Sequence, residues 1–535
     1  MLRDAKPTRL EDLIVLNALF RPGPMSLIPS FVARKHGREK VEYPHPLAEP
    51  ILAETYGIMV YQEQVMQTAQ VLGGYSLGGA DLLRRAMGKK KADEMALHRS
   101  IFREGASKNN ISTEQADAIF DLMEEFAGYG FNKSHAAAYS LLAYQTAWIK
   151  VHFTSEFFSA NMTVEMDDTD KLKILFDDAQ SMGIQFDRPD INAGVYAFVP
   201  LSKYRIRYGL GAIKGTGQSA IEAICEARVE GGPFNSLFDF CARVDRSRIN
   251  KRAVEALVKS GAFDGLGDNR AQLLASVGLA FEYAQTQTDH VHQVGLFDVE
   301  DSHGSSKNEP ALENASQWGV REKLTHEKAA VGFHLSGHLF EEAQAELRQF
   351  LKTKLSDLSE SKEPQWVTGI VLDERTINTA KGRLTIFLID DMSACLEVSA
   401  DDAVFTRYKN LIKEDLLLVA RVKVQVDRRN SSLRLILMDA MDLTQARCQF
   451  GKYVRLSLGA ALPDIATLLT QYPPRPLSGS VADSSAGLGM RLNLLVGGST
   501  VELQLGQRAC FFPTDAALQM IASHPSVHDM SIVYD

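Results

Sequence analysis

A polar stretch from Thr286 to Gln317 divides this chain into two regions of different character. The stretch is rich in Gln, Asp, Ser, Asn and Glu and has few apolar residues, so it cannot bury enough surface to fold alone. The 535 residues also exceed what one core usually holds, because cores rarely grow beyond about 250 to 300 residues. The sequence therefore predicts a multidomain protein with a flexible linker, which we place at residues 286–325.

The spacing of apolar residues differs on the two sides of the linker. Before it, apolar residues recur with helical spacing, most clearly from Ser140 to Met162, and a mainly α region is expected. After it, residues 364–443 alternate as short strands with a Lys381-Gly382 turn and one helix near Asp402, which is typical of a five-stranded OB-fold β-barrel. The last part, residues 446–535, predicts a small α/β domain.

Composition excludes several classes of protein. No apolar run approaches the roughly 20 residues that span a bilayer, and no signal peptide is evident, so we expect a cytoplasmic protein without a membrane partner. Because the net charge is -9, any binding of a polyanion must depend on local basic patches. The cysteines are odd in number and form no Cys-x-x-Cys pair, so neither a disulfide framework nor a zinc site is indicated: Cys225, Cys241, Cys395, Cys448 and Cys510.

The segment GYGFNKSHAAAY predicts a helix with a basic start. Asn132 or Ser134 can cap this helix, and its first amides carry partial positive charge that suits a phosphate. Lys133 adds a full charge, and His135 and Tyr139 are four residues apart on one helical face. The helix start is therefore a candidate anion site, with an ordinary solvated helix start as the alternative.

Further clusters of cations precede this helix. Arg84 and Arg85 lie in the last turns of a predicted helix that ends at Gly88, and Lys89, Lys90 and Lys91 follow it. These cations do not alternate with acids, so a polyanion is their natural partner, while a solvated surface is the alternative. A third basic group indicates the same kind of partner and consists of Arg34, Lys35, His36, Arg38 and Lys40.

Two glycine-rich hairpins predict contacts made by the backbone. The turn Gly215-Thr216-Gly217 opens a helix, and its amides can approach a phosphate closely because glycine has no side chain. A comparable unit recurs between two later helices, where the candidate contacts are Gly265, Gly267 and Arg270. Two such units indicate tandem helix-hairpin-helix DNA binding that does not depend on base sequence. Two ordinary helical hairpins are the alternative.

Five segments carry a resemblance to a known family: ALFRPGP, RKHGRE, TYGIMVYQEQVMQ, GGADLLRRAMGKKK and FAGYGFNKSHAAAY. They resemble the fingers region of the bacterial DNA polymerase III alpha subunit, the C-family of replicative polymerases, and the similarity continues through the chain with falling sharpness. The resemblance implies fingers at residues 1–170, tandem hairpins at 171–285, a helical connector at 326–363, the OB fold at 364–445 and a carboxy-terminal domain at 446–535 that binds the clamp-loader tau subunit.

The resemblance also assigns tasks to the basic residues. Arg84, Arg85, Lys133 and His135 would contact the incoming deoxynucleoside triphosphate, and Lys89, Lys90 and Lys91 would contact its phosphates or DNA. The complete family member is a DNA-directed DNA polymerase, a nucleotidyltransferase that acts on primer-template DNA with Mg²⁺ and other core polymerase subunits. Its catalytic aspartates lie on a palm that precedes the fingers. We assign no catalytic residue and no metal ligand here, and expect this chain to be inactive alone. A non-enzymatic DNA-binding scaffold and one half of a split polymerase are the alternatives.

Several acids and histidines are close enough in the sequence to be considered as metal ligands, but their spacing and surroundings do not indicate a metal site. Asp167, Asp168 and Asp170 precede a helix, where acids satisfy the helix dipole. Asp390 and Asp391 lie in a strand and turn pattern. No further ligand set completes a zinc site around His326, His334 and His338.

The predicted barrel offers few aromatic side chains on which bases could stack. Trp366 and Phe387 are the main ones, so we expect weak binding of single-stranded DNA. The candidate contacts are the basic residues Arg375, Lys381, Arg383, Arg428 and Arg429.

The linker contains the pattern Gln-x-x-Leu-Phe, formed by Gln293, Leu296 and Phe297. It resembles the peptide by which bacterial polymerases hold the sliding clamp. A mobile segment that exposes Leu and Phe needs an apolar pocket on a partner, with Gln fixing the register. The sequence therefore predicts a clamp-binding peptide.

Replacing both Leu296 and Phe297 by Ala should abolish measurable binding of the chain to a purified sliding clamp. A few buried anchors carry most of the energy of such a contact, so a loss of about 3 kcal/mol or more is expected, at about 1.4 kcal/mol per tenfold in Kd. Calorimetry measures the affinity, with Asp298→Ala as the control that leaves it unchanged. Unaltered clamp affinity in the double variant would leave the pattern without a function.

Overall fold

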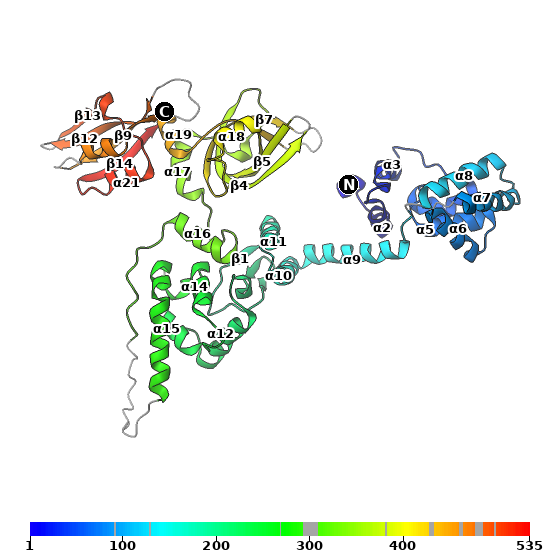
Figure 1. Cartoon of the computed structure of the whole chain (residues 1–535), viewed down its shortest axis with the longest axis horizontal. Coiled ribbons are helices and arrows are strands. Elements are labelled where there is room, and N and C mark those ends of the chain that lie inside the picture. The colour runs from blue at the N-terminus through cyan, green and yellow to red at the C-terminus, as the bar shows by residue number, and fades with distance from the viewer. Residues whose placement is uncertain are drawn as a thin grey trace. The chain divides into compact units, whose positions relative to one another are not determined.

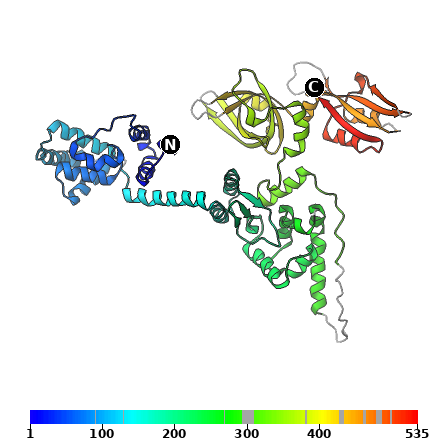
Figure 2. The same ribbon diagram turned by 180° about the vertical axis from the view of Figure 1, so that it is seen from behind.

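The computed structural model describes residues 1–89, 92–127, 130–267, 269–292, 309–379, 382–426, 433–459, 464–476, 485–496 and 499–534. These residues form two compact units, which we treat separately (Figures 1 and 2). The first unit comprises Met1–Val164 with two short later segments, Leu175–Gln185 and Val199–Ile206. The second unit comprises Glu165–Ile174, Phe186–Phe198 and Arg207–Asp535.

The first unit is helical, as its sequence predicts. Helix α6 extends to Lys89, so the predicted end at Gly88 is one residue early. The helices are α1 (Leu2–Ala5), α2 (Leu10–Leu19), α3 (Ile28–Lys35), α4 (Glu49–Leu52), α5 (Gln62–Gly73), α6 (Leu77–Lys89), α7 (Ala92–Ser107), α8 (Thr113–Ala127), α9 (Lys133–His152) and α10 (Thr154–Val164). Helix α11 (Thr169–Ser181) and the short strands β1 (Gln185–Asp187), β2 (Val199–Ser202) and β3 (Arg205–Arg207) follow in the chain.

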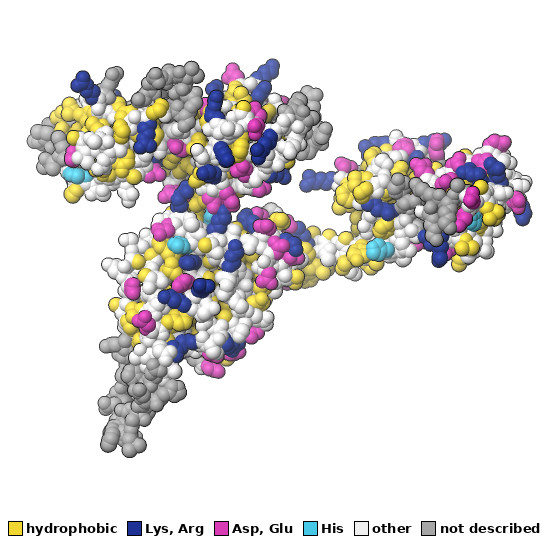
Figure 3. Space-filling view, viewed as in Figure 1, with side chains coloured by type: hydrophobic (Ala, Val, Ile, Leu, Met, Phe, Trp, Pro, Cys, Tyr) yellow, Lys and Arg dark blue, Asp and Glu magenta, His cyan; other side chains and the backbone are white. Residues whose placement is uncertain are grey.

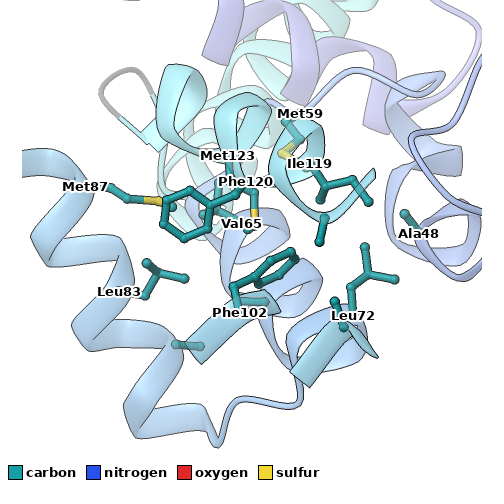
Figure 4. Close-up of a cluster of buried hydrophobic side chains, with 14 of the residues drawn as sticks. Ala48, Met59, Val65, Leu72, Leu83, Met87, Phe102, Ile119, Phe120 and Met123 are labelled. Atoms are coloured by element: carbon teal, nitrogen blue, oxygen red, sulfur yellow. The ribbon is translucent and has the colours of Figure 1, made fainter. Parts of the chain in front are cut away.

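Two hydrophobic cores hold the first unit together. Helices α5 to α8 enclose one core, in which Phe102, Phe120 and Met123 are fully buried (Figure 4). The second core gathers side chains of α2 and α3 around Tyr61 and reaches Ala136 at the start of α9. The chain thus fixes the start of α9 against two parts of the sequence that lie far upstream.

Helix α9 is covered only in its first turns, and every residue from Leu141 to Ile149 is exposed. Ala136 and Ser140 are buried, whereas Tyr139, Leu142 and Trp148 retain 56%, 53% and 46% of their surface exposed. Figure 3 shows apolar surface along this helix. The apolar periodicity predicts this helix correctly, but it does not show which of its turns are covered.

The second unit begins with the helices of the predicted hairpin region. They are α12 (Gln218–Gly231), α13 (Leu237–Arg243), α14 (Lys251–Ser260) and α15 (Arg270–His292), with a short 3-10 turn at Asp264–Leu266. Helices α16 (Val320–Val331) and α17 (Glu341–Phe350) form the connector to the barrel. Among the described residues, no helix has both the length and the apolar content needed to cross a membrane.

A closed five-stranded barrel follows, which confirms the predicted OB-like fold. Its strands are β4 (Gln365–Thr379), β5 (Gly382–Asp390), β6 (Cys395–Asp401), β7 (Leu417–Val426) and β8 (Leu433–Met441), in the order β4-β5-β6-β8-β7. Strands β6 and β8 pair in parallel at Val398 and Leu435. The predicted helix near Asp402 is α18 (Asp402–Tyr408), which Asp401 caps through the amide of Val404.

The carboxy-terminal part is the predicted small α/β domain. A four-stranded sheet runs in the order β13-β12-β9-β14. Buried Arg447 ties this domain to α17, because its guanidinium donates to Glu346 Oε1 at 2.7 Å and to Asp515 Oδ1 at 2.6 Å. The elements are α19 (Leu443–Phe450), β9 (Gly451–Leu458), α20 (Ile465–Gln471), β10 (Arg475–Pro476), β11 (Ser485–Ala486), β12 (Gly489–Val496), β13 (Ser499–Gln504), α21 (Asp515–Ala522) and β14 (Val527–Tyr534).

Helices α5 and α7 cross so closely that glycine is required at the contact. A Cβ on Gly105 would lie 1.8 Å from the carbonyl oxygen of Gly73, a backbone atom that cannot rotate away, and the backbone of α7 fixes the position of the Cβ. We therefore expect Gly105→Ala to destabilise this crossing by about 1 to 3 kcal/mol, the usual range for overpacking. Amide hydrogen exchange across α5 and α7 in the full chain measures the local opening energy.

The matched control for this substitution is Gly78→Ala in α6, where an added Cβ would meet nothing within 4 Å. It should leave exchange unchanged or slow it slightly, because alanine favours helix over glycine. Equal exchange in the two variants would contradict the close-crossing explanation.

Candidate nucleotide and nucleic-acid interface

The first turn of α9 is capped as the sequence predicts, by Asn132. Its Oδ1 accepts hydrogen bonds from the amide of His135 at 2.8 Å and the hydroxyl of Ser134 at 2.6 Å. The carboxylate of Glu63 also lies at this helix start, where it accepts from the Lys133 amide at 3.1 Å and the Asn132 side-chain amide at 3.1 Å. The predicted anion site thus holds an anion that the chain itself provides.

The predicted cations also face carboxylates of their own unit. Lys133 Nζ lies 2.6 Å from Glu54 Oε2 and 5.4 Å from the centre of the Tyr61 ring. Arg84 and Arg85 each approach Asp81 to 2.8 Å. The hydrogen bond from Arg84 lowers the pKa of Asp81, with the charge of Arg85 adding to the effect. Each carboxylate occupies a position that suits a phosphate oxygen.

Gln62 brings the two groups of cations into one neighbourhood. Its Oε1 accepts from Arg84 at 3.4 Å, and its Nε2 donates to the carbonyl of Gly130 at 3.0 Å. The Gln62 amide donates to Phe131 at 2.9 Å, so the start of α5 is fastened to the segment that leads into α9. Arg84 and Lys133, 49 positions apart in the sequence, therefore flank the same few residues.

His135 and Tyr139 share a face of α9, as their spacing predicts. The His135 ring lies 4.8 Å from the Tyr139 ring and 5.6 Å from the Phe131 ring. His135 and Tyr139 are exposed on the helix, and half-buried Phe131, which precedes the helix, completes a short aromatic row. Such a row offers a flat apolar surface beside the basic helix start.

The other predicted phosphate contacts either lack a described side chain or pair with carboxylates. Lys90 and Lys91 lie outside the described residues, and the side chain of Lys89 is not described. In the third basic group, Arg34 donates to Glu39 at 2.7 Å and Lys35 lies 3.4 Å from Asp12. These two cations thus pair with carboxylates of their own unit.

The first hairpin has the open backbone that its glycines predict. Gly215 has a φ of 85°, which favours glycine, and a Cβ on Gly215 or Gly217 would meet nothing within 4 Å. Thr216 is buried, and its hydroxyl donates to the carbonyls of Leu210 at 2.8 Å and Ile213 at 2.6 Å. The Thr216 amide also donates to the carbonyl of Ile213 at 3.2 Å, so this residue holds the turn in shape between the two glycines.

The second hairpin is also open at its glycines, but its arginine faces inward. A Cβ on Gly265 or Gly267 would meet nothing within 4 Å. Arg270 retains only 4% of its surface, and it donates to both oxygens of Asp264 at 2.6 Å and to Glu327 at 3.3 Å. The predicted contact at Arg270 is thus an internal ion pair that fixes the hairpin to α16.

The barrel provides less for single-stranded DNA than its sequence suggested. Phe387 is fully buried in the barrel core, so it cannot stack on a base, and Trp366 packs edge to face on Phe450 at 5.6 Å. Arg375 pairs with Glu397 at 3.0 Å, and Arg383 is exposed. The remaining candidates, Lys381, Arg428 and Arg429, lie outside the described residues, as do the linker residues Gln293, Leu296 and Phe297.

The acids that drew attention in the sequence have structural partners. Asp168 accepts from the amide of Lys171 at 3.1 Å at the start of α11, and this bond lowers the pKa of Asp168. Buried Asp391 accepts from Arg348 at 2.6 Å and from the amide of Leu355 at 3.1 Å. Within the described ranges, no group of three or more His, Cys, Asp or Glu side chains is arranged to hold a metal.

Sequence reasoning missed the carboxylates that surround the cations. Asp81 could have been found, because it precedes Arg84 and Arg85 by three and four residues on one helix, where opposite charges meet. No local signal points to Glu54, Gln62 or Glu63, since their contacts with α9 and α6 depend on the tertiary fold.

Comparisons with known proteins match both regions of the chain that carry these candidate contacts. Residues 1–110 match the family described as the bacterial DNA polymerase III alpha subunit finger domain, and residues 183–273 match a helix-hairpin-helix motif. The chain is 47% identical over 498 residues to DNA polymerase III subunit alpha of Neisseria meningitidis serogroup B, which covers 91% of this chain and 43% of the relative. It is 43% identical over 491 residues to DNA polymerase III subunit alpha of Pseudomonas aeruginosa, which covers 86% and 42%.

The chain thus spans less than half the length of these relatives. A solved structure of RecG bound to a three-way DNA junction matches with a TM-score of 0.12 and 12% identity over 40% of this chain and 32% of that chain. This score is too low to support a comparison of folds.

Removing the internal competitor should strengthen anion binding at α9. Asp81→Asn leaves Arg84 and Arg85 without their carboxylate, so the chain should bind inorganic tripolyphosphate about two- to fivefold more tightly, the range of a partly exposed ion pair. Calorimetry at low ionic strength measures this affinity. The control Asp93→Asn changes an exposed acid of α7 and should have no effect. Weaker binding in Asp81→Asn would show that Asp81 holds the arginines in place for the anion.

Proposed function

Because the chain belongs to the family of bacterial DNA polymerase III alpha subunits, from the finger domain onward, we propose that it binds the incoming deoxynucleoside triphosphate and holds DNA in template-directed DNA synthesis during chromosome replication. The observation that carries the proposal is the meeting of Arg84 and Lys133 around Gln62 at the basic start of α9. A helix start with two such cations matches the charge of a triphosphate.

In this proposal the triphosphate replaces the chain's own carboxylates. Asp81 and Glu54 now accept the hydrogen bonds of Arg84 and Lys133, and Glu63 accepts that of the Lys133 amide. Phosphate oxygens offer the same acceptor chemistry with more charge. The rings of His135 and Tyr139 then lie where a base or sugar could pack.

In this proposal, the two hairpins bind the DNA backbone. Their open glycines allow backbone amides to meet phosphates of either strand, so the contact does not depend on base sequence. Binding should weaken steeply with salt through counterion release. The barrel would add weak contact with the single-stranded template through Arg375 and Arg383.

The chemical step requires groups that we do not assign to this chain. The complete polymerase would use Mg²⁺ held by palm aspartates to activate the primer hydroxyl. Asp168 and Asp391 are engaged in a helix cap and a buried ion pair, respectively. We propose that this chain alone extends no primer.

In this proposal, two further parts of the chain each bind a protein partner of the polymerase. The linker peptide at Gln293, Leu296 and Phe297 would bind the sliding clamp, and the α/β domain at residues 446–535 would bind the clamp-loader tau subunit. A clamp that encircles DNA raises the local concentration of this chain at the primer, so that several weak contacts suffice.

The test is a polymerase in which this chain replaces the matching part of the Neisseria meningitidis relative. Arg84→Ala should raise KM for deoxynucleoside triphosphate about 10- to 100-fold, because it removes hydrogen bonds to a charged group. Affinity for primer-template should stay within about twofold, since the hairpins hold the DNA. Single-nucleotide incorporation and DNA binding are measured separately.

Arg103→Ala is the matched control for this variant. Arg103 also pairs with an aspartate of the first unit, Asp117 at 2.7 Å, but it lies on α7 away from the start of α9. It should leave both quantities unchanged. A loss of DNA affinity in Arg84→Ala with normal KM would assign Arg84 to the template and refute the nucleotide role.

A further inference from the structure

A polar cavity of about 420 Å³ lies in the second unit, at the side of the second hairpin that faces α16. Its walls come from four separate parts of the chain: Arg188 after β1, Asp264 and Arg270 of the second hairpin, Gln317 and Trp318 before α16, and Lys323 within α16. The volume falls in the range of about 300 to 1,000 Å³ that is usual for small-molecule sites. None of the fingers residues contributes to it.

The back wall of the cavity is an ion-pair network that is already complete. Arg270 is buried between Asp264 and fully buried Glu327. The second oxygen of Glu327 accepts from the amides of Leu335 at 2.7 Å and Ser336 at 2.7 Å. These acids make their short hydrogen bonds to Arg270 and to the backbone, and so they fix the position of the wall.

Two cations of the cavity remain after this pairing. Arg188 touches Asp264 only at 3.5 Å and keeps 51% of its side chain exposed. For Lys323, the described part of the chain provides no hydrogen-bond acceptor to the amine. Partial burial lowers the pKa of Lys323, the nearby charges of Arg270 and Arg188 lower it further, and those of Asp264 and Glu327 oppose the shift only in part. The cavity thus has uncompensated positive charge next to a desolvated amine.

The cavity also has an aromatic wall that is held in place. The Trp318 ring stacks on His326 with 4.1 Å between ring centres and 29° between planes. The irregular segment before it is fastened to α15, where the amide of Glu313 donates to Ser276 at 2.8 Å and Asn269 donates to the carbonyl of Ala315 at 3.0 Å. Gln317 adds an amide at the rim.

From this arrangement we propose that the cavity is a binding site for the phosphate group of a nucleotide, with Lys323 and Arg188 on the phosphate and Trp318 beside the sugar or base. A hydrogen-bonding amine and a guanidinium match phosphate, and a fixed aromatic ring matches the flat remainder of a nucleotide. The nucleotide is either free or a unit of a DNA strand. The site does not depend on the proposed triphosphate site at α9, since it uses other residues of another unit.

The experiment titrates the full chain with deoxyadenosine monophosphate, with deoxyadenosine, and with a six-nucleotide oligothymidine with and without a 5′ phosphate. The indole signal of Trp318, assigned with Trp318→Phe, reports on the cavity, and the indoles of Trp148 and Trp366 serve as internal controls. The phosphate-bearing probes should shift the Trp318 signal, and deoxyadenosine should not. Tighter binding of the mononucleotide identifies a free nucleotide as the ligand, and tighter binding of the oligonucleotide identifies a strand.

Variants then locate the phosphate. Lys323→Met should weaken binding at this signal by about tenfold or more, whereas Lys323→Arg, which keeps the charge, should stay within about threefold. The control is Lys352→Met, which removes an exposed lysine of the same unit and should have no effect. A Trp318 signal that no phosphate-bearing probe shifts, or equal affinity in Lys323→Met and the parent chain, would overturn the proposal. Binding that is lost only in Lys133→Ala would belong to the α9 site instead and would also overturn it.

Discussion

The short backbone bridge between Tyr61 and Phe131 is the contact on which the candidate triphosphate site depends. The Phe131 amide donates to Val60 at 3.1 Å, and the Gln62 amide donates to Phe131 at 2.9 Å, so the start of α5 and the entry to α9 are held together. This register places the side chains of Gln62 and Glu63 at α9 and next to Arg84. Without the bridge, the two groups of cations would belong to separate helices with no common ligand.

The arrangement also explains how a chain of net charge -9 can offer sites for phosphate. Its exposed cations near the start of α9 are held in fixed positions by carboxylates of the same unit, Asp81 and Glu54. Such partly exposed pairs contribute little stability in water, about 1 kcal/mol or less each. They are therefore easily exchanged for a ligand of higher charge. These acids keep the basic side chains in position and offset the repulsion that a cluster of cations without acids would have.

Local signals account for what the sequence predicted, and long-range partners account for what it did not. The cap at Asn132 and the open glycines of the hairpins follow from residue type and spacing alone. The inward orientation of Arg270 depends on Glu327, which lies 57 residues further along the chain. Phe387 is a similar case in a strand: the sequence suggested a ring that bases could stack on, but the ring is buried. A shift of one residue in register decides whether a strand side chain faces the core or the solvent, and the local sequence does not fix that register.

Arg270 and Lys323 lie close together beside the second hairpin, but they have different roles: Arg270 forms an internal ion pair, and Lys323 lines the cavity. The guanidinium of Arg270 stays charged under all ordinary conditions, so its burial requires the matching acids Asp264 and Glu327. Burial and the charges of Arg270 and Arg188 lower the pKa of Lys323, and the charges of the same two acids oppose this shift without reversing it. A phosphate beside Lys323 would raise this pKa again, because an anion favours the charged form of the amine. Arg188, Lys323 and Arg270 together place three cations against these two acids, and this excess of positive charge suits the cavity to an anionic ligand.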